Sequence, residues 1–147
     1  HRDLHSFPTR RSSDLSILAF LDERRLITCR LHAAPPGWVD VAVSARVVRA
    51  PGSAATDVTT AILARLQTFF APVGDGSASS GWPFGKDVHL SEVAAALEGV
   101  AGVDHVKHLC LFQVDAGAIG PRTQVVPVPP NSLVRFTAAQ SEIISDL

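Results

Sequence analysis

Alternation of hydrophobic and polar residues predicts a long strand in the first half of the chain. From Trp38 to Val48, alternate positions are apolar and lie on one side of an extended chain: Val39, Val41, Val43, Ala45 and Val47. Because successive side chains of a strand point to opposite faces, this pattern predicts a half-buried strand, and its many β-branched residues favour the same structure. The segment from Leu26 to Ala33 alternates in the same way and predicts another half-buried strand.

A helix is predicted after the long strand, because apolar residues recur there at helical spacing. Its apolar side contains Val58, Ile62, Leu66, Phe69 and Phe70. Thr56 or Asp57 is the expected N-cap, since a side-chain oxygen at that position accepts a hydrogen bond from a free backbone amide. Pro72 is expected to end the helix, and the small residues of Val73–Ser80 predict a loop.

A second helix is predicted to start at a Ser91 N-cap, with Glu92 favourable in its first turn because the helix N-terminus carries partial positive charge. Its buried side is formed by Val93, Leu97 and Val100. Gly102 is the expected C′ residue of this helix. Nearer the N-terminus, Ser16–Leu21 has the character of the last turns of a further helix.

Five segments after the first of these two helices have the character of strands. They are Lys86–Leu90, Val103–Asp115, Thr123–Val128, Leu133–Phe136 and Glu142–Leu147, of which the last two are the weakest. Val103–Asp115 becomes apolar on both faces toward its end, which is typical of a central strand. A turn is expected at Ala116–Pro121 and a break at Pro129–Asn131.

This order of elements predicts an α+β fold with one mixed β-sheet and two helices packed on one face. Short connections between the strands disfavour repeated crossovers. The simplest arrangement of this class is a split β-α-β unit, a variant of the ferredoxin-like fold.

Composition narrows the classes of partner. The chain has 147 residues, of which 46% are hydrophobic and 18% charged, and a formal net charge of −1. That charge does not favour binding to nucleic acid or to an anionic membrane, and no apolar run reaches the length of a membrane span. The cysteines, Cys29 and Cys110, are far apart in the sequence. They favour a reducing environment, with a single disulfide between them as the alternative.

The first fifteen residues, His1–Leu15, differ from the rest of the chain because they show no apolar periodicity. In one reading frame they resemble the translation of a universal adapter oligonucleotide used in short-read DNA sequencing. We therefore expect residues 1–15 to be an artefactual or disordered tail and residues 16–147 to form the domain. A transit peptide is the other interpretation of this segment. The native protein is expected to extend further upstream.

Candidate catalytic groups are few and scattered. His105 and His108 are three residues apart in a predicted strand, so they are expected to point to opposite faces and not to share a metal ion. His89 lies near Asp87 and Glu92 in the sequence, but no nucleophile accompanies them. We therefore expect no enzymatic activity, no metal and no cofactor.

The segment Gly81–Lys86 has a glycine at each end of a short loop and a lysine after it, but it does not match a phosphate-binding loop. That motif requires four residues between its glycines and Ser or Thr after the lysine, whereas here three residues intervene and Asp87 follows,. Cys29 and Cys110 lie in apolar predicted strands without a basic partner, so both are interpreted as small hydrophobic residues.

The most distinctive segment of the chain is Gly81, Trp82, Pro83, Phe84 and Gly85. Its glycines permit unusual backbone angles, its proline is rigid, and its aromatic rings each bury about 150–250 Å² when covered. These properties predict a rigid aromatic loop. The loop either closes the edge of its own core or anchors a partner protein.

The adjacent arginines Arg24 and Arg25 follow Asp22 and Glu23 at the expected end of the N-terminal helix. They form either a solvated helix end or a clamp to carboxylates, within the chain or at an interface.

Four segments resemble the baseplate J-like family of baseplate assembly proteins. They are Leu21–Thr28, Trp38–Val48, Gly81–Val93 and Gly102–Val106, and the Gly-Trp-Pro-Phe-Gly sequence within the third is the most specific. The resemblance extends from about Ser16 to Val134. It lacks the family's N-terminal part, and the sequence after Phe136 departs from the family pattern.

The resemblance implies a structural component of the baseplate wedge of a contractile phage tail or phage-like injection particle. Such a protein has no active site and contacts other wedge subunits and copies of itself. It is assembled in the bacterial cytoplasm and becomes part of the tail or particle. The resemblance therefore implies no nucleic acid, membrane or small-molecule partner. The alternative function is that of a ligand-binding or enzymatic ferredoxin-like domain, which would need a pocket with converging polar groups.

Overall fold

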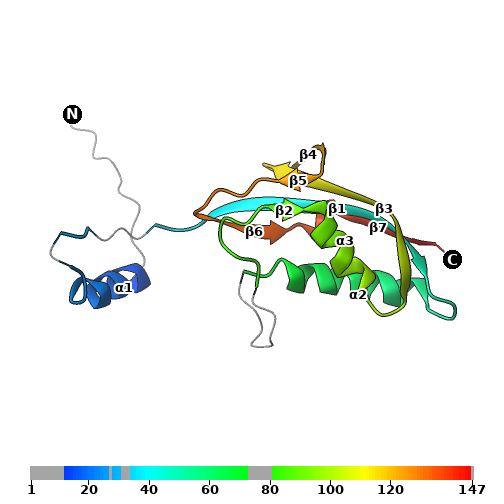
Figure 1. Cartoon of the computed structure of the whole chain (residues 1–147), viewed down its shortest axis with the longest axis horizontal. Helices are drawn as coiled ribbons and strands as arrows, with labels where there is room; N and C mark the ends of the chain where they lie inside the picture. The colour runs from blue at the N-terminus through cyan, green and yellow to red at the C-terminus, as the bar shows by residue number, and fades with distance from the viewer. Residues whose placement is uncertain (1–11, 27, 31–33, 73–80, 147) are drawn as a thin grey trace. The chain divides into compact units, whose positions relative to one another are not determined.

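The computed structural model describes residues 12–26, 28–30, 34–72 and 81–146 (Figure 1). The chain divides into two compact units, His1–Pro35 and Pro36–Leu147. The first unit contains helix α1 (Ser12–Asp22), which confirms the helix expected at Ser16–Leu21 and begins before it. Most of the predicted tail, residues 1–11, and the predicted loop, residues 73–80, lie outside the described residues.

The strand predicted from Leu26 to Ala33 is wrong where the structure describes it. Leu26 and residues 28–30 are exposed and form no strand, while residues 27 and 31–33 lie outside the described residues. The Cys29 amide donates to the Leu26 carbonyl at 2.9 Å, which closes a turn. Alternation shows only that a segment would have one apolar face if it were extended. A strand also needs a neighbouring strand to pair with.

A mixed five-stranded sheet is the centre of the second unit (Figure 1). Its strands are β1 (Gly37–Arg49), β3 (Val103–Asp115), β4 (Ala118–Thr123), β6 (Ser132–Phe136) and β7 (Glu142–Asp146). Their order is β4-β3-β1-β6, and β7 also pairs with β1. β3 runs antiparallel to β1, whereas β6 and β7 run parallel to it. The predicted long strand and the predicted central strand are thus both confirmed.

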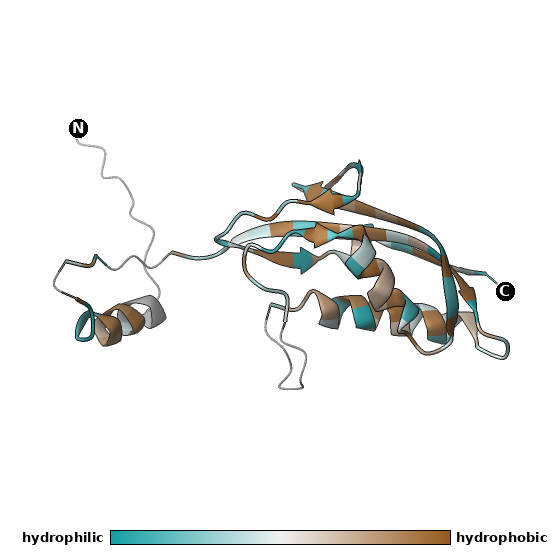
Figure 2. Ribbon diagram, viewed as in Figure 1, coloured by the Kyte–Doolittle hydropathy of each residue, from teal (hydrophilic) through white to brown (hydrophobic). Residues whose placement is uncertain are grey.

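Helices α2 (Ala55–Phe69) and α3 (Leu90–Glu98) lie on one face of this sheet, as predicted (Figure 1). Figure 2 shows hydrophobic residues on the strands and on the helices that cover them. Fully buried core residues come from β1 (Val41, Val43, Val47), α2 (Ile62, Leu66) and α3 (Val93, Leu97). Burial of these predicted apolar positions confirms the α+β class, because it places the core between one sheet face and both helices.

The connectivity differs from that of a ferredoxin-like split β-α-β unit. Both helices lie in sequence between β1 and β3, which are antiparallel neighbours. A β-α-β crossover would instead join parallel strands. The strand expected at Lys86–Leu90 is reduced to β2 (Val88–His89), which pairs with β5 (Val125–Val126) in a separate two-stranded sheet. β5 is also shorter than the predicted Thr123–Val128.

Both predicted N-caps are wrong. Helix α2 has Ala54 as its N-cap and α3 has His89, in each case without a side-chain cap hydrogen bond. Thr56, Asp57 and Ser91 therefore lie inside the first turns of these helices. A residue type that is favoured at N-caps therefore did not identify the residue at which either helix begins.

The predicted helix end and turn in the second half also differ from the structure. Helix α3 ends at a Gly99 C-cap, whereas Gly102, with φ of +88°, lies in the turn that leads into β3. The turn expected at Ala116–Pro121 involves only Ala116 and Gly117, because β4 already begins at Ala118. Both of these turn residues have positive φ, which makes a two-residue connection between β3 and β4 possible,.

Candidate functional site

The loop from Gly81 to Lys86 places Trp82 inside the core. Only 4% of Trp82 is exposed, and its ring centroid lies 5.1 Å from that of Phe69 and 5.5 Å from that of Phe70. Its indole Nε1 donates to the Lys86 carbonyl at 2.9 Å, and its backbone amide donates to the Ala71 carbonyl at 2.7 Å. Trp82 therefore anchors both ends of the loop to the end of α2.

Phe84 points away from the core on the same loop and is 60% exposed. The following residue, Gly85, has φ of +63° and packs so closely that a Cβ there would lie 2.7 Å from Pro130 Cα. Its amide donates to the Ser132 carbonyl at 3.1 Å. Because the backbone is fixed on both sides of Phe84, this ring is displayed on a rigid support.

Lys86 and Glu92 close the other side of the loop. Lys86 Nζ lies 2.5 Å from Glu92 Oε1 and 4.6 Å from the Trp82 ring centroid. Glu92 Oε2 is buried, and none of the described residues forms a hydrogen bond with it. Beside this pair is a hollow of about 310 Å³, whose lining includes Arg65 and Phe69. The ion pair and the cation–π contact both hold the lysine over the indole ring.

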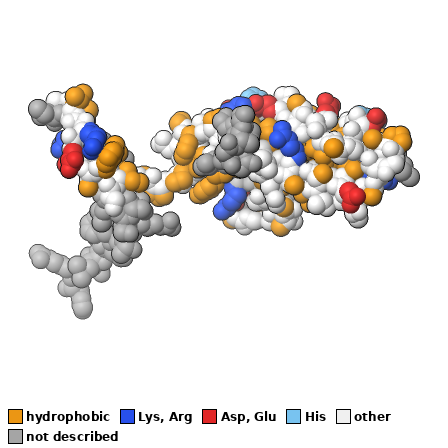
Figure 3. Space-filling view, turned by 90° about the horizontal axis from the view of Figure 1, so that it is seen from below, with side chains coloured by type: hydrophobic (Ala, Val, Ile, Leu, Met, Phe, Trp, Pro, Cys, Tyr) orange, Lys and Arg blue, Asp and Glu red, His pale blue; other side chains and the backbone are white. Residues whose placement is uncertain are grey.

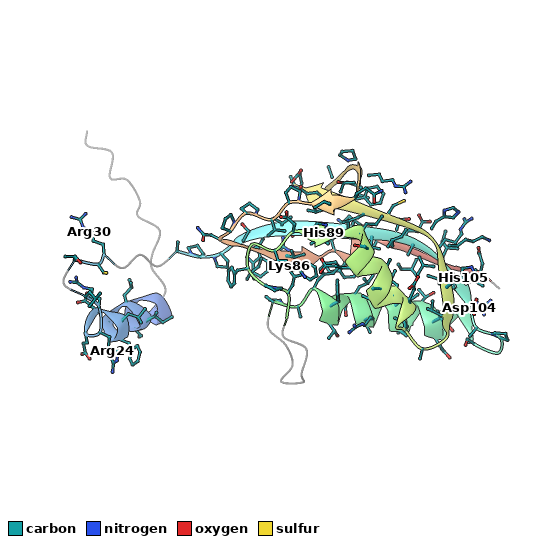
Figure 4. All side chains as sticks on the ribbon, in the orientation of Figure 1. Arg24, Arg30, Lys86, His89, Asp104 and His105 are labelled. Atoms are coloured by element: carbon teal, nitrogen blue, oxygen red, sulfur yellow. The ribbon has the colours of Figure 1, made fainter. Side chains whose placement is uncertain are left out.

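His89, Asp87 and Glu92, which are close in the sequence, do not form an acid–base group in the structure. Asp87 Oδ1 accepts a hydrogen bond from the Val128 amide at 2.8 Å, and Glu92 is paired with Lys86. His89 is exposed and lies at the start of α3, where Figure 4 labels it. Each carboxylate thus has a structural partner in place of the histidine.

A second exposed aromatic residue, Trp38, was not singled out as a site residue by the sequence. It is 48% exposed near the start of β1. Arg135 of β6 binds Asp40 through two hydrogen bonds of 2.7 Å, and its guanidinium carbon lies 5.8 Å from the Trp38 ring centroid. The hydrogen bond to Asp40 and the charge of Asp40 raise the pKa of Arg135. This arrangement holds a planar cation beside an exposed indole ring.

Trp38 and Arg135 border an apolar hollow of about 270 Å³. It is also lined by Gln67, Phe70, Pro72, Val134 and Phe136. The Phe70 and Phe136 rings stack, with their centroids 5.9 Å apart. The hollow is therefore lined by an aromatic cluster in which Phe136 stacks on Phe70, and Phe70 contacts the buried Trp82.

Trp38 and Phe84 lie at one end of the second unit, and each is next to a glycine that is hydrogen-bonded to the chain at the start of β6. The Gly37 amide donates to the Asn131 carbonyl at 2.9 Å, and the Gly85 amide donates to the Ser132 carbonyl at 3.1 Å. We call the exposed surface formed by Trp38, Pro83, Phe84 and Pro130 the aromatic end. Figure 3 shows hydrophobic side chains gathered at this end of the unit. Only Pro83 and Phe84 of this surface were expected from the sequence.

The prediction that His105 and His108 face opposite sides of their strand is wrong. A register shift between Arg46 and Val47 makes His108 the partner of Arg46 and His105 the partner of Val48. Both histidines therefore share the face of the sheet that is turned away from the helices. His105 Nδ1 lies 2.8 Å from Asp104 Oδ2 (Figure 4).

In the first unit, the adjacent arginines make local contacts. Arg24 Nη1 donates to the Phe20 carbonyl at 2.8 Å, and its guanidinium lies 3.9 Å from the Phe20 ring centroid (Figure 4). Arg25 pairs with Asp22 and donates through Nη1 to the Cys29 carbonyl at 3.0 Å. These contacts fasten the end of α1 to the turn that follows it.

Among the described residues, no group of three or more His, Cys, Asp or Glu side chains is arranged to hold a metal ion. Cys29 and Cys110 are both free thiols, so the alternative disulfide is not present. Within the same described ranges, no helix combines the length and apolar character needed to cross a membrane. No protein-family model and no curated protein matched this chain.

Proposed function

We propose that the α+β unit is a structural module of a baseplate wedge, in a contractile tail or phage-like injection particle, and that it works through protein–protein contacts. The observation that carries this proposal is the aromatic end, where exposed Trp38 and Phe84 stand on rigid backbone. Exposed aromatic residues on a rigid support are typical of the residues that dominate binding energy at protein interfaces.

The aromatic loop supports an assembly role because its rings have different functions. Trp82 is an internal anchor, whereas Phe84 is free to enter a partner's surface. A loop that is already ordered loses little conformational entropy on binding, and affinity benefits from that preorganisation. The baseplate context itself rests on the resemblance of Gly81–Val93 and the neighbouring segments to the baseplate J-like family.

The Arg135–Asp40 pair supports the same role. It lies beside Trp38, and the two hydrogen bonds leave the arginine fixed and its charge balanced. A partner that covers Trp38 would therefore meet an ion pair that is already satisfied. An unpaired charge would oppose docking, because its burial is costly.

Co-purification of the full chain with co-expressed baseplate wedge subunits tests this proposal. We expect Trp38→Ala and Phe84→Ala each to weaken the complex while lowering the unfolding temperature only slightly, because 48% of Trp38 and 60% of Phe84 is exposed. His105→Ala is the matched control, since the His105 side chain is 55% exposed on β3 and lies opposite Val48, at the other end of β1 from Trp38. Complexes of equal yield for all variants would contradict the proposal, as would a small molecule that stabilises the chain through the hollow beside Arg65.

A further inference from the structure

One edge of β1 is occupied by two separate strands in succession. β6 pairs with its first part, where Phe136 is opposite Val41, and β7 pairs with its second part, where Glu142 is opposite Ser44. Between these strands the chain leaves the sheet and forms a short 3₁₀ turn, Ala138–Gln140. The edge strand is therefore interrupted although its two parts run in the same direction on the same neighbour.

Hydroxyl groups replace the missing backbone pairing at this interruption. The Val43 amide donates to Ser141 Oγ at 3.0 Å, and Ser141 Oγ donates to the Thr137 carbonyl at 2.9 Å. The Val41 carbonyl accepts hydrogen bonds from both the amide and the hydroxyl of Thr137, each at 2.9 Å. This hydroxyl joint satisfies β1 without a continuous ladder, so β7 is attached independently of β6.

β7 is held less firmly than β6. None of its residues is buried, although Ile143 packs against the edge of the core, whereas Ser132, Leu133 and Val134 of β6 are buried. Its last residue, Asp146, lies 3.9 Å from both Arg46 Nε and Lys107 Nζ, and these side chains are substantially exposed. Exposed ion pairs of this kind contribute little to stability. Edge segments with little burial open before the rest of a domain unfolds.

We propose that β7 is a releasable strand, and that its release opens the Val43–Val48 edge of β1 to β7 of a second copy of the chain. The structure already shows which segment fits this edge, because β7 pairs with it within one chain. A second copy offers the identical segment, so exchange forms the same contacts between two molecules. When extended, the Thr137–Ser141 segment spans about 17 Å and can serve as the hinge.

The register of the edge provides a direct test. Between the two paired parts, residues 137–141 of the edge chain lie opposite only Ala42 and Val43 of β1. The edge chain therefore has three residues more than β1 here, which is the length of the 3₁₀ turn. Deletion of Ala138–Gln140 would bring Thr137 opposite Ala42 and Ser141 opposite Val43 in one continuous strand. Deletion of Ala138 and Ala139 alone is the matched control, because one excess residue remains and a parallel pair rarely accommodates such a residue as a bulge,.

Two measurements on the full chain test the release of β7 and its exchange between copies: amide hydrogen exchange, and the molecular mass of the protein in solution. In the unaltered chain we expect the β7 amides to exchange at least about tenfold faster than those of β6, and a dimer to form at high protein concentration and to persist on dilution. The three-residue deletion is expected to protect β7 to the level of β6 and to abolish the dimer, whereas the two-residue deletion does neither.

A cross-link between register partners identifies the exchanged strand. Arg46 and Ile144 are register partners in β1 and β7. The test chain therefore carries Arg46→Cys and Ile144→Cys, and its natural thiols are removed by Cys29→Ser and Cys110→Ser. Oxidation then forms a disulfide between positions 46 and 144. The isolated dimer is expected to become covalent. A dimer whose disulfide stays within each chain would overturn the proposal, as would a purely monomeric chain or β7 amides that exchange only with global unfolding. Loss of this proposal would leave the role of the aromatic end untouched, because none of these residues belongs to it.

Discussion

Truncation of the buried ring of the aromatic loop, Trp82, is expected to lower the free energy of unfolding much more than truncation of the exposed ring, Phe84. Trp82→Ala removes a 4% exposed ring that contacts Phe69 and Phe70, together with the indole donor to the Lys86 carbonyl. Truncation of a buried tryptophan costs about 3–5 kcal/mol, because apolar contacts are lost and a cavity remains. Phe84→Ala removes a 60% exposed ring and is expected to change stability by less than about 0.5 kcal/mol,.

Far-UV circular dichroism during urea and thermal unfolding measures both effects. At about 4 °C per kcal/mol for a domain of this size, Trp82→Ala is expected to lower the unfolding temperature by about 12–20 °C. Trp82→Phe is the control that keeps an aromatic ring but loses the Nε1 donor, so it should fall between the other variants. Equal unfolding midpoints for Trp82→Ala and Phe84→Ala would refute the assignment of one ring to the core and the other to the surface.

Further predictions concern the backbone. Gly85→Ala is expected to destabilise the unit by more than the roughly 1–2 kcal/mol of a left-handed conformation, because its Cβ would also meet Pro130 at 2.7 Å. Gly52→Ala is the matched control in chemical denaturation, since Gly52 has φ of +89° but, its chain neighbours aside, no atom of the described residues lies within 4 Å of an added Cβ; equal losses would show that the contact with Pro130 is unimportant. Ser141→Ala should cost about 1–3 kcal/mol because it leaves the Val43 amide without an acceptor, and it should accelerate amide exchange in β7; unchanged stability would contradict the hydroxyl joint.

Local patterns were sufficient to predict most of the core. Alternation from Val39 to Val47 and helical spacing at Ile62 and Leu66 identified side chains that the structure buries, because each pattern reflects one face of one element,. The same reasoning failed at Leu26–Ala33, since alternation contains no information about a partner strand. It also failed for His105 and His108, because a register shift changes which face a residue takes.

The candidate site was only half predictable. Phe84 and Trp82 belong to one distinctive segment, so the sequence could single out the loop, but not which ring is buried. Trp38 gains its role from Arg135 and from the segment before β6, nearly a hundred residues away along the chain. No local pattern encodes such a contact, and the same holds for the bond between Ser141 and Val43.

Photo-crosslinking from the aromatic end tests the central claim most directly. Phe84 is replaced by a photoreactive phenylalanine analogue in the full chain, which is then assembled with the other wedge subunits and irradiated. We predict a covalent product in which mass spectrometry identifies a baseplate wedge subunit, whereas the same analogue at His105, at the other end of β1 from Trp38, gives none. Absence of a product at position 84, or equal products at both positions, would contradict an assembly function for the aromatic end.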